Sequence, residues 1–157
     1  MKNAYICILL MILYTTTMAQ TKIFKGYSTS QTDVICNINE GRLYKKISTN
    51  QSDVQFNIKD GKIYKKISTN QSDIVFTVRD NKLYNGISTN QSDILFTFRD
   101  GKIYKKISTN QSDIVFTAKN GFIYKGINTN QSNIILRYTD GLTIEMLFLV
   151  CYFNTLV

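Results

Sequence analysis

The sequence predicts an all-β protein built from a tandem array of about six β-hairpins, each about twenty residues long. Two observations carry this prediction. The stretch DGKIYKKISTNQSDIVFT occurs unchanged at Asp60–Thr77 and Asp100–Thr117. The motif ISTNQSD begins at 47, 67, 87 and 107, with weaker copies at 27 and 127, so the period is twenty without insertion. A fixed period in this range is typical of arrays whose units pack on their neighbours. We therefore expect residues 20–141 to form one repeat domain.

Each repeat has the pattern of a strand, a tight turn and a second strand. Ile74, Phe76 and Val78 alternate with other residues, and this period of two with β-branched side chains indicates a strand. The turn position holds Asp-Gly at 60–61 and at 100–101. Asp-Gly suits a type I′ turn, in which both central residues have positive φ. The segment KLYNGI, at 82–87, then predicts the second strand of its repeat.

A two-residue turn at 80–81 fixes the expected register of this hairpin. Val78 should pair with Leu83, Phe76 with Asn85, and Ile74 with Ile87, because directly opposed residues share a face. Ile74, Phe76, Val78, Leu83 and Ile87 would then all lie on one buried face. The same register in the preceding repeat buries Val54, Phe56, Ile58, Ile63 and Ile67, with Lys65 beside Phe56. A lysine there can lay its stem over the ring and keep its ammonium in water.

The sequence leaves the arrangement of the hairpins open. They can stack as a solenoid or continue as a rolled antiparallel meander. A closed ring is an alternative, because residues 22–27 resemble an orphan second strand and residues 133–138 an orphan first strand, and these two could pair. A parallel β-helix is a further alternative. It would stack Asp53, Asp73 and Asp93 about 4.8 Å apart, which like charges oppose.

The two ends of the chain differ from the repeats. Residues 1–19 combine Lys2, an apolar core and small residues at Thr17 and Ala19, which is the pattern of a secretory signal peptide cleaved after Ala19. We therefore expect a secreted, periplasmic or cell-surface protein. Residues 142–157 are almost wholly apolar, and Thr143 could N-cap a helix. We expect a capping helix that covers the last hairpin, with a short membrane anchor as the alternative.

Two cysteines, Cys36 and Cys151, remain after the predicted signal peptide. An exported pair could form one disulfide. Alternatively both are buried thiols, because Cys36 stands where other repeats carry Phe.

The repeat resembles a group of small exported bacterial proteins built from STxxSDIxFTxxDGKIYKG units. The stretch STNQSDIVFTVRDNKLY carries the resemblance, together with AQTKIFKG near the start and LTIE near the end. It covers residues 20 to about 145. It implies a signal peptide, several repeats and a closing segment, and no established activity comes with it. A looser likeness to choline-binding repeats does not extend to their aromatic cages, which use Trp, because this chain has no Trp.

The composition argues against catalysis. The chain has no His, so Ser–His and Cys–His pairs are excluded. Near-identical repeats also present the same surface many times rather than one asymmetric site. We expect no enzyme activity, no catalytic residue and no cofactor. Each loop offers one carboxylate, such as Asp53, whereas a calcium site collects six to eight oxygen ligands. We expect the loop Ser, Thr, Asn and Asp side chains to hydrogen-bond within turns instead.

Lysine and tyrosine recur at one strand position of most repeats, and the formal net charge is +8. Together they form a possible stripe for a polyanion or glycan: Tyr44, Lys45, Lys46, Tyr64, Lys65, Lys66, Tyr84, Tyr104, Lys105, Lys106, Tyr124 and Lys125. The alternative is a solvated face that protects sheet edges.

We therefore expect an exported, non-enzymatic repeat protein with a structural or adhesive role through a multivalent β surface. The alternative is a lectin-like or polyanion-binding module that uses the Tyr/Lys stripe. An acidic polysaccharide or another cell-surface polymer is the expected partner, and self-association is possible. Nucleic acid is not an expected partner. Membrane contact is expected only through the signal peptide or the C-terminal segment.

Overall fold

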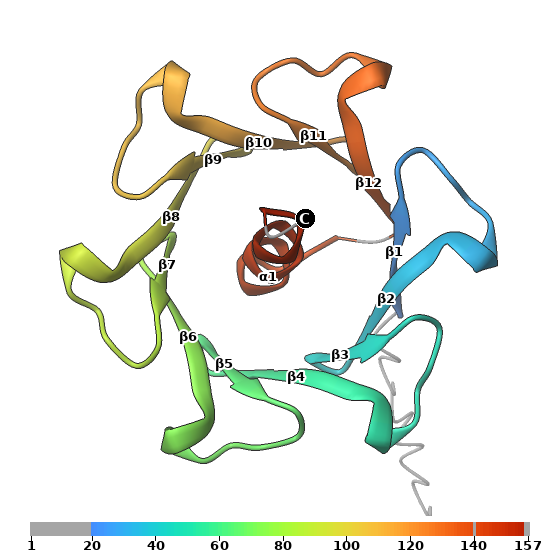
Figure 1. Ribbon diagram of the computed structural model, residues 1–157, viewed down its shortest axis with the longest axis vertical. Coiled ribbons are helices and arrows are strands. Elements are labelled where there is room, and N and C mark those ends of the chain that lie inside the picture. The colour runs from blue at the N-terminus through green and yellow to red at the C-terminus, as the bar shows by residue number, and fades with distance from the viewer. Residues whose placement is uncertain (1–19, 140, 156–157) are drawn as a thin grey trace, which may run out of the picture.

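The computed structural model describes residues 20–139 and 141–155, which form a closed ring of antiparallel strands around one central helix (Figure 1). The helix is α1, Ile144–Thr155. The strands are β1 Thr21–Lys25, β2 Val34–Asn39, β3 Arg42–Lys45, β4 Val54–Lys59, β5 Lys62–Lys65, β6 Ile74–Arg79, β7 Lys82–Asn85, β8 Ile94–Arg99, β9 Lys102–Lys105, β10 Ile114–Lys119, β11 Phe122–Lys125 and β12 Ile134–Tyr138.

The ring closes because the first and last strands pair with each other. Each strand pairs with its sequence neighbours, and β1 also pairs with β12 through Ile23–Tyr138 and Lys25–Leu136. The all-β prediction is confirmed, and the closed-ring alternative is the correct arrangement. The open stacked solenoid and the parallel β-helix are wrong. Closure replaces them because it pairs the two orphan strands and leaves no sheet edge among the described strands.

The tight turns have the predicted left-handed geometry. In the turn between β4 and β5, φ is 51° at Asp60 and 69° at Gly61. A Cβ added to Gly61 would lie 2.8 Å from the carbonyl oxygen of Val78 in the next hairpin. Glycine therefore serves both the turn and the close approach of the neighbouring strand.

The predicted hairpin register is confirmed for the first two residue pairs and wrong for the third. Val78 pairs with Leu83, and Phe76 pairs with Asn85. In the preceding repeat, Lys65 lies opposite Phe56 as expected. However, β7 ends at Asn85, and Gly86 turns the chain with a φ of 63°. Ile87 therefore lies in a loop and is exposed, as is Ile67.

A β-bulge explains why Ile74 does not share a face with Phe76. On the other side of β6, Phe76 pairs with Ile63 and Ile74 pairs with Tyr64, so the register shifts between them. The extra residue moves Ile74 to the outer face of the ring. The same shift recurs between β3 and β4, where it pairs Val54 with Tyr44. Val54 is buried, as predicted, but it lies on the outer face instead of beside Phe56.

The inner face of the ring carries the main core. Its side chains include Ile63, Leu83 and Ile103, which are fully buried, and a second row, mostly of Phe, nearer one end. That row consists of Cys36, Phe56, Phe76, Phe96, Phe116 and Leu136. Rings of this size need a filler, because twelve strands enclose more space than their own side chains occupy.

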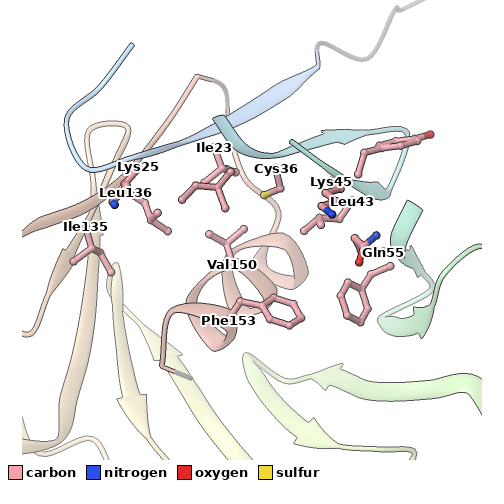
Figure 2. A pocket seen from close by; sticks show the side chains of 13 residues that line it. Ile23, Lys25, Cys36, Leu43, Lys45, Gln55, Ile135, Leu136, Val150 and Phe153 are labelled. Atoms are coloured by element: carbon pink, nitrogen blue, oxygen red, sulfur yellow. The ribbon is translucent and has the colours of Figure 1, made fainter. Parts of the chain in front are cut away.

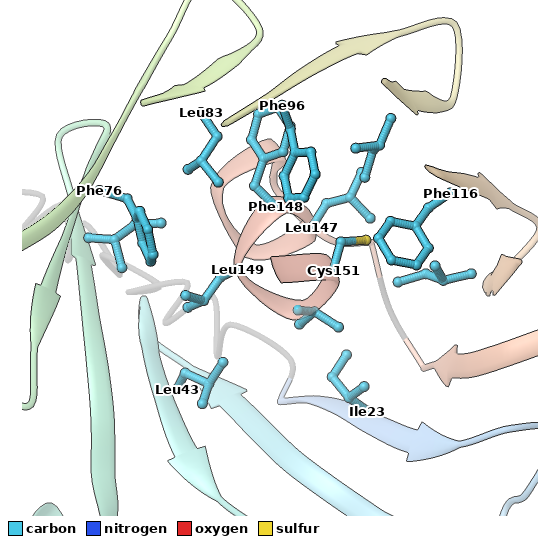
Figure 3. Packing of buried hydrophobic residues seen from close by; sticks show 14 of the residues in the cluster. Ile23, Leu43, Phe76, Leu83, Phe96, Phe116, Leu147, Phe148, Leu149 and Cys151 are labelled. Atoms are coloured by element: carbon cyan, nitrogen blue, oxygen red, sulfur yellow. The ribbon is translucent and has the colours of Figure 1, made fainter. Parts of the chain in front are cut away.

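Helix α1 supplies that filler. Leu147, Phe148, Leu149, Val150 and Cys151 are consecutive and all buried, as befits a helix that is apolar on every side. Figure 3 shows them surrounded by inner-face side chains from around the ring. The helix was expected, but its place as a cap on the last hairpin is wrong: it fills the centre because every hairpin presents an apolar face there.

The helix begins as the sequence predicts. The Thr143 hydroxyl accepts a hydrogen bond from the Met146 amide at 3.4 Å, so Thr143 is the N-cap. Among the residues that the structure describes, no helix has the length and apolar character needed to cross a membrane. The predicted signal peptide, residues 1–19, lies outside the described residues. Cys36 and Cys151 are separate, buried thiols.

Candidate functional site

Six loops project outward from one end of the ring, like petals, and each joins an odd-numbered strand to the next strand (Figure 1). In the third petal, residues 66–73, the Ser68 hydroxyl donates to Asp73 Oδ2 at 2.6 Å and accepts from the Asn70 amide at 3.0 Å. The same Ser–Asp bond recurs in the first five petals. The prediction that these polar residues serve turn hydrogen bonds is confirmed.

Ser68→Ala tests how much this bond stabilises a petal. The variant should lower the free energy of unfolding by about 1 kcal/mol, because it removes a hydrogen bond to a carboxylate that is only partly buried. Urea unfolding measures the change. Thr69→Ala is the matched control, because Thr69 is exposed in the same petal, and it should change stability by less than about 0.5 kcal/mol. Equal effects would contradict a special role for the Ser–Asp bond.

The five tyrosines of the predicted stripe are buried under the petals. Tyr64 is only 7% exposed and pairs with Asn57 on one side and Ile74 on the other. The Asn57 side chain donates to the Ser68 carbonyl at 3.1 Å, which holds the petal over this outer-face layer. In later repeats Thr77, Thr97 and Thr117 stand at this position, and their hydroxyls donate to the first carbonyl of the petal, at Gly86, Lys106 and Gly126. Tyr44, Tyr64, Tyr84, Tyr104 and Tyr124 therefore cannot offer their rings to a ligand.

The lysines of the stripe remain exposed and gather at the petal end. The odd-numbered strands end, in chain order, at Lys25, Lys45, Lys65, Asn85, Lys105 and Lys125. Their pairing with the row of large core residues, such as Lys65 with Phe56, places them on the inner side of the ring. We call the end of the ring formed by these six positions and the residues that follow them the petal mouth. The tyrosines and lysines lie on different faces of the ring because adjacent residues of a strand point to opposite faces.

The residue after each of these strand ends has a left-handed backbone. Lys46, Lys66 and Lys106 have φ values of 53°, 51° and 55°. The equivalent positions in the other three repeats are Gly26, Gly86 and Gly126, also with positive φ. The petal mouth thus carries eight lysines: Lys25, Lys45, Lys46, Lys65, Lys66, Lys105, Lys106 and Lys125. Five petal carboxylates lie in the adjoining loops, each already bonded to a serine.

The petals also carry exposed apolar side chains. The strongly exposed large apolar side chains among the described residues lie in the petals, apart from Ile35 in β2 and Phe153 near the end of α1: Tyr27, Ile35, Ile47, Ile67, Ile87, Ile107, Ile127 and Phe153. Five of these are the first residue of the ISTNQSD or INTNQSN motif. The opposite end carries the tight turns with mixed charges, including the exposed pairs Arg79–Asp80 and Arg99–Asp100.

This six-petalled ring also has a counterpart among known protein families. The profile of the family described as "6-fold beta flower protein" matches residues 23–149. The chain belongs to the 6-fold beta flower family. No curated protein and no solved structure is significantly similar to the chain. The predicted tandem-repeat character is thereby confirmed for this beta flower.

Sequence reasoning found the lysines of the beta flower but missed the apolar surface beside them. Ile67 and Ile87 were expected in the core because a perfect alternation was continued past the strand end. The signal that could have placed them outside is the preceding residue, where Gly26, Gly86 and Gly126 mark a position that requires positive φ.

Proposed function

We propose that this protein is an exported, non-enzymatic adhesive module that binds an acidic cell-surface polymer, such as an acidic polysaccharide, through the lysines of the petal mouth. One surface is repeated around the ring, so weak contacts from several repeats would add along a single polymer chain. A basic face of this kind also raises the rate at which a polyanion associates. The adhesive role is favoured over a scaffold role, because closure removes the sheet edges through which copies would otherwise pair.

The observation that carries the proposal is the backbone strain at Lys46, Lys66 and Lys106. A residue with a Cβ pays about 1–2 kcal/mol in the left-handed region, and glycine avoids this cost. Three repeats of the same chain hold glycine at this position, so glycine fits the fold there. Lysine at the other three therefore costs stability, and strain of this kind is concentrated at functional sites.

Replacing these three lysines together with glycine tests the proposal. The triple variant K46G/K66G/K106G should elute from heparin at a clearly lower salt concentration than the parent protein, because three cations of the mouth are gone. Its free energy of unfolding should rise by about 1 kcal/mol per site at most, because the strain is relieved, and its urea midpoint should rise with it. Loss of binding then cannot be ascribed to unfolding. Unchanged elution, with the gain in stability, would contradict the proposal.

A matched control distinguishes the effect of the petal-mouth lysines from the effect of net charge alone. The variant K59S/K82S/K119S removes three exposed or half-exposed lysines near the tight turns and changes the net charge equally. It should keep most of the retention on heparin. The four-site variant K65S/K66S/K105S/K106S should lose more retention than this control.

An anionic lipid surface is a second candidate, and the exposed isoleucines of the petals favour it. Apolar side chains beside lysines are the combination that binds the interface of an anionic bilayer. Sedimentation with phosphatidylserine vesicles measures this directly. The variant I47S/I67S/I107S should reduce vesicle binding and leave heparin retention intact if lipid is the partner. If neither changes, the isoleucines have no part in binding.

A further inference from the structure

A cavity of about 650 Å³ lies between helix α1 and one side of the ring (Figure 2). The wall comes from β1, β2, β3, β4 and β12, and the helix contributes Val150 and Phe153. In Figure 2, Val150 lies across from Ile23 and Cys36 of the wall. Protein interiors are packed with few voids larger than a water molecule, and small-molecule sites have volumes of about 300–1,000 Å³. The size of this cavity is that of a ligand site.

The cavity arises where two repeats depart from the repeated pattern. Four hairpins place a Phe in the row that faces α1: Phe56, Phe76, Phe96 and Phe116. The two strands that pair with β1 carry smaller residues in this row, Cys36 in β2 and Leu136 in β12. Of the two aromatic residues near the end of the helix, Tyr152 packs away from this gap, and Phe153 packs at its edge. Tyr152 contacts Phe76 and Phe96, with ring centroids 4.6 and 6.5 Å apart, and Phe153 contacts Phe56 at 5.1 Å. The smaller side chains and the one-sided packing of the helix leave the space open.

The chemistry of the cavity is polarised between its floor and its rim. The floor is apolar and includes Ile23, Leu43, Leu136 and Val150, all buried. The rim carries exposed polar side chains: Lys25, Lys45 and Gln55. No Asp or Glu occurs among the residues that line the cavity, so the two ammonium groups have no carboxylate there.

The thiol of Cys36 belongs to the apolar part. Burial raises the pKa of Cys36 to about 12, so the thiol stays neutral at physiological pH. A neutral buried thiol behaves as a small apolar group and is a poor nucleophile. The cavity is therefore suited to noncovalent binding of a ligand, with an apolar floor and a cationic rim.

We propose that this cavity binds a medium-chain fatty acid or another amphiphile with an acyl chain and a carboxylate. The acyl chain lies against Ile23, Cys36 and Val150, and the carboxylate lies at the rim between Lys25 and Lys45. This site is separate from the polymer-binding role proposed above, since it needs the interior of the ring and only two of the eight lysines.

Calorimetric titration of the purified full chain with dodecanoate, below its micelle concentration, tests the proposal. We expect saturable binding of one molecule per chain. Affinity should rise about fourfold for each methylene added from octanoate upward until the cavity is filled. Dodecanol has the same chain without the charge and should bind more weakly. No saturable heat with dodecanoate, or equal affinity for dodecanol, would overturn the proposal.

Two sets of variants locate the bound molecule. Cys36→Phe restores the residue that four other repeats carry and should abolish binding while raising the melting temperature; Leu136→Phe serves the same purpose if that variant folds poorly. K25Q/K45Q should weaken dodecanoate binding about fivefold, as expected for two exposed ion pairs. K105Q/K125Q removes two lysines at equivalent strand ends that do not line the cavity, and it should leave dodecanoate affinity unchanged.

The same variants separate this site from the polymer site. Cys36→Phe should keep its retention on heparin, and the two lysine pairs should lower that retention equally. The proposal is wrong if Cys36→Phe binds dodecanoate as well as the parent protein does. It is also wrong if K25Q/K45Q and K105Q/K125Q lose the same amount of dodecanoate affinity.

Discussion

Phe148→Ala is expected to lower the free energy of unfolding by about 3–5 kcal/mol, the usual cost of truncating a buried aromatic side chain. Phe148 is fully buried in the central helix and lies among inner-face side chains of the ring (Figure 3). The loss is expected to be large because the surrounding wall is closed and cannot collapse inward on one side without breaking strand pairs. Urea unfolding followed by circular dichroism measures it.

Phe153→Ala is the matched control for this prediction. Phe153 is the same residue type on the same helix, but it is 38% exposed and lies at the edge of the cavity. It should cost about 1 kcal/mol, mostly from its ring contact with Phe56. If the two substitutions have equal effects, the helix is not the filler of the ring core, and the packing described above is wrong.

Tyr104→Ala is expected to cost about 3 kcal/mol of stability without a matching loss of heparin retention in the folded fraction. Tyr104 is 7% exposed and pairs with Thr97 and Ile114 beneath its petal. Its removal leaves a gap between the ring and the petal. Tyr104→Phe keeps the ring in place and should retain most of the stability.

The contrast with Tyr27→Ala makes this second prediction specific. Tyr27 occupies a petal rather than a strand and is 59% exposed, with its ring stacked on Phe122 at 5.3 Å. Its truncation should cost about 1 kcal/mol or less. If Tyr104→Ala instead weakens heparin binding and leaves stability unchanged, the tyrosines do face a ligand, and their assignment to the outer-face core is wrong.

The repeat unit was predictable from the sequence because its signals are local. Asp60-Gly61 fixes a two-residue turn, and that turn sets the pairing of Phe56 with Lys65. The sequence allowed the ring only as an alternative: each end strand lacks its partner in the repeat, so the two could pair, but an open array with covered ends fitted the same pattern. Thr143 marked the start of the helix through its hydroxyl.

Local signals did not predict which face of the ring each side chain lies on, and they did not predict the cavity. The bulge that separates Ile74 from Phe76 has no sequence signature of its own, because Val75 is an ordinary strand residue. Continued alternation therefore placed Ile74 and Ile87 in the core. The central place of the helix depends on the diameter of the closed ring, which is a property of all the strands together. The cavity beside Cys36 follows from that placement, so the substitution of Phe by Cys indicated a buried thiol but not an open space.

The helix at the centre also limits how this gene can evolve. An open solenoid gains or loses a repeat without disturbing the others, because each unit touches only its neighbours. Here a further duplication would add two strands and widen the ring, while the single helix at its centre keeps its width. Deletion of a repeat would narrow the ring until its inner side chains clash with the helix. Although near-identical tandem copies recombine readily, copy number in this lineage should stay locked at six unless the C-terminal segment changes in the same step.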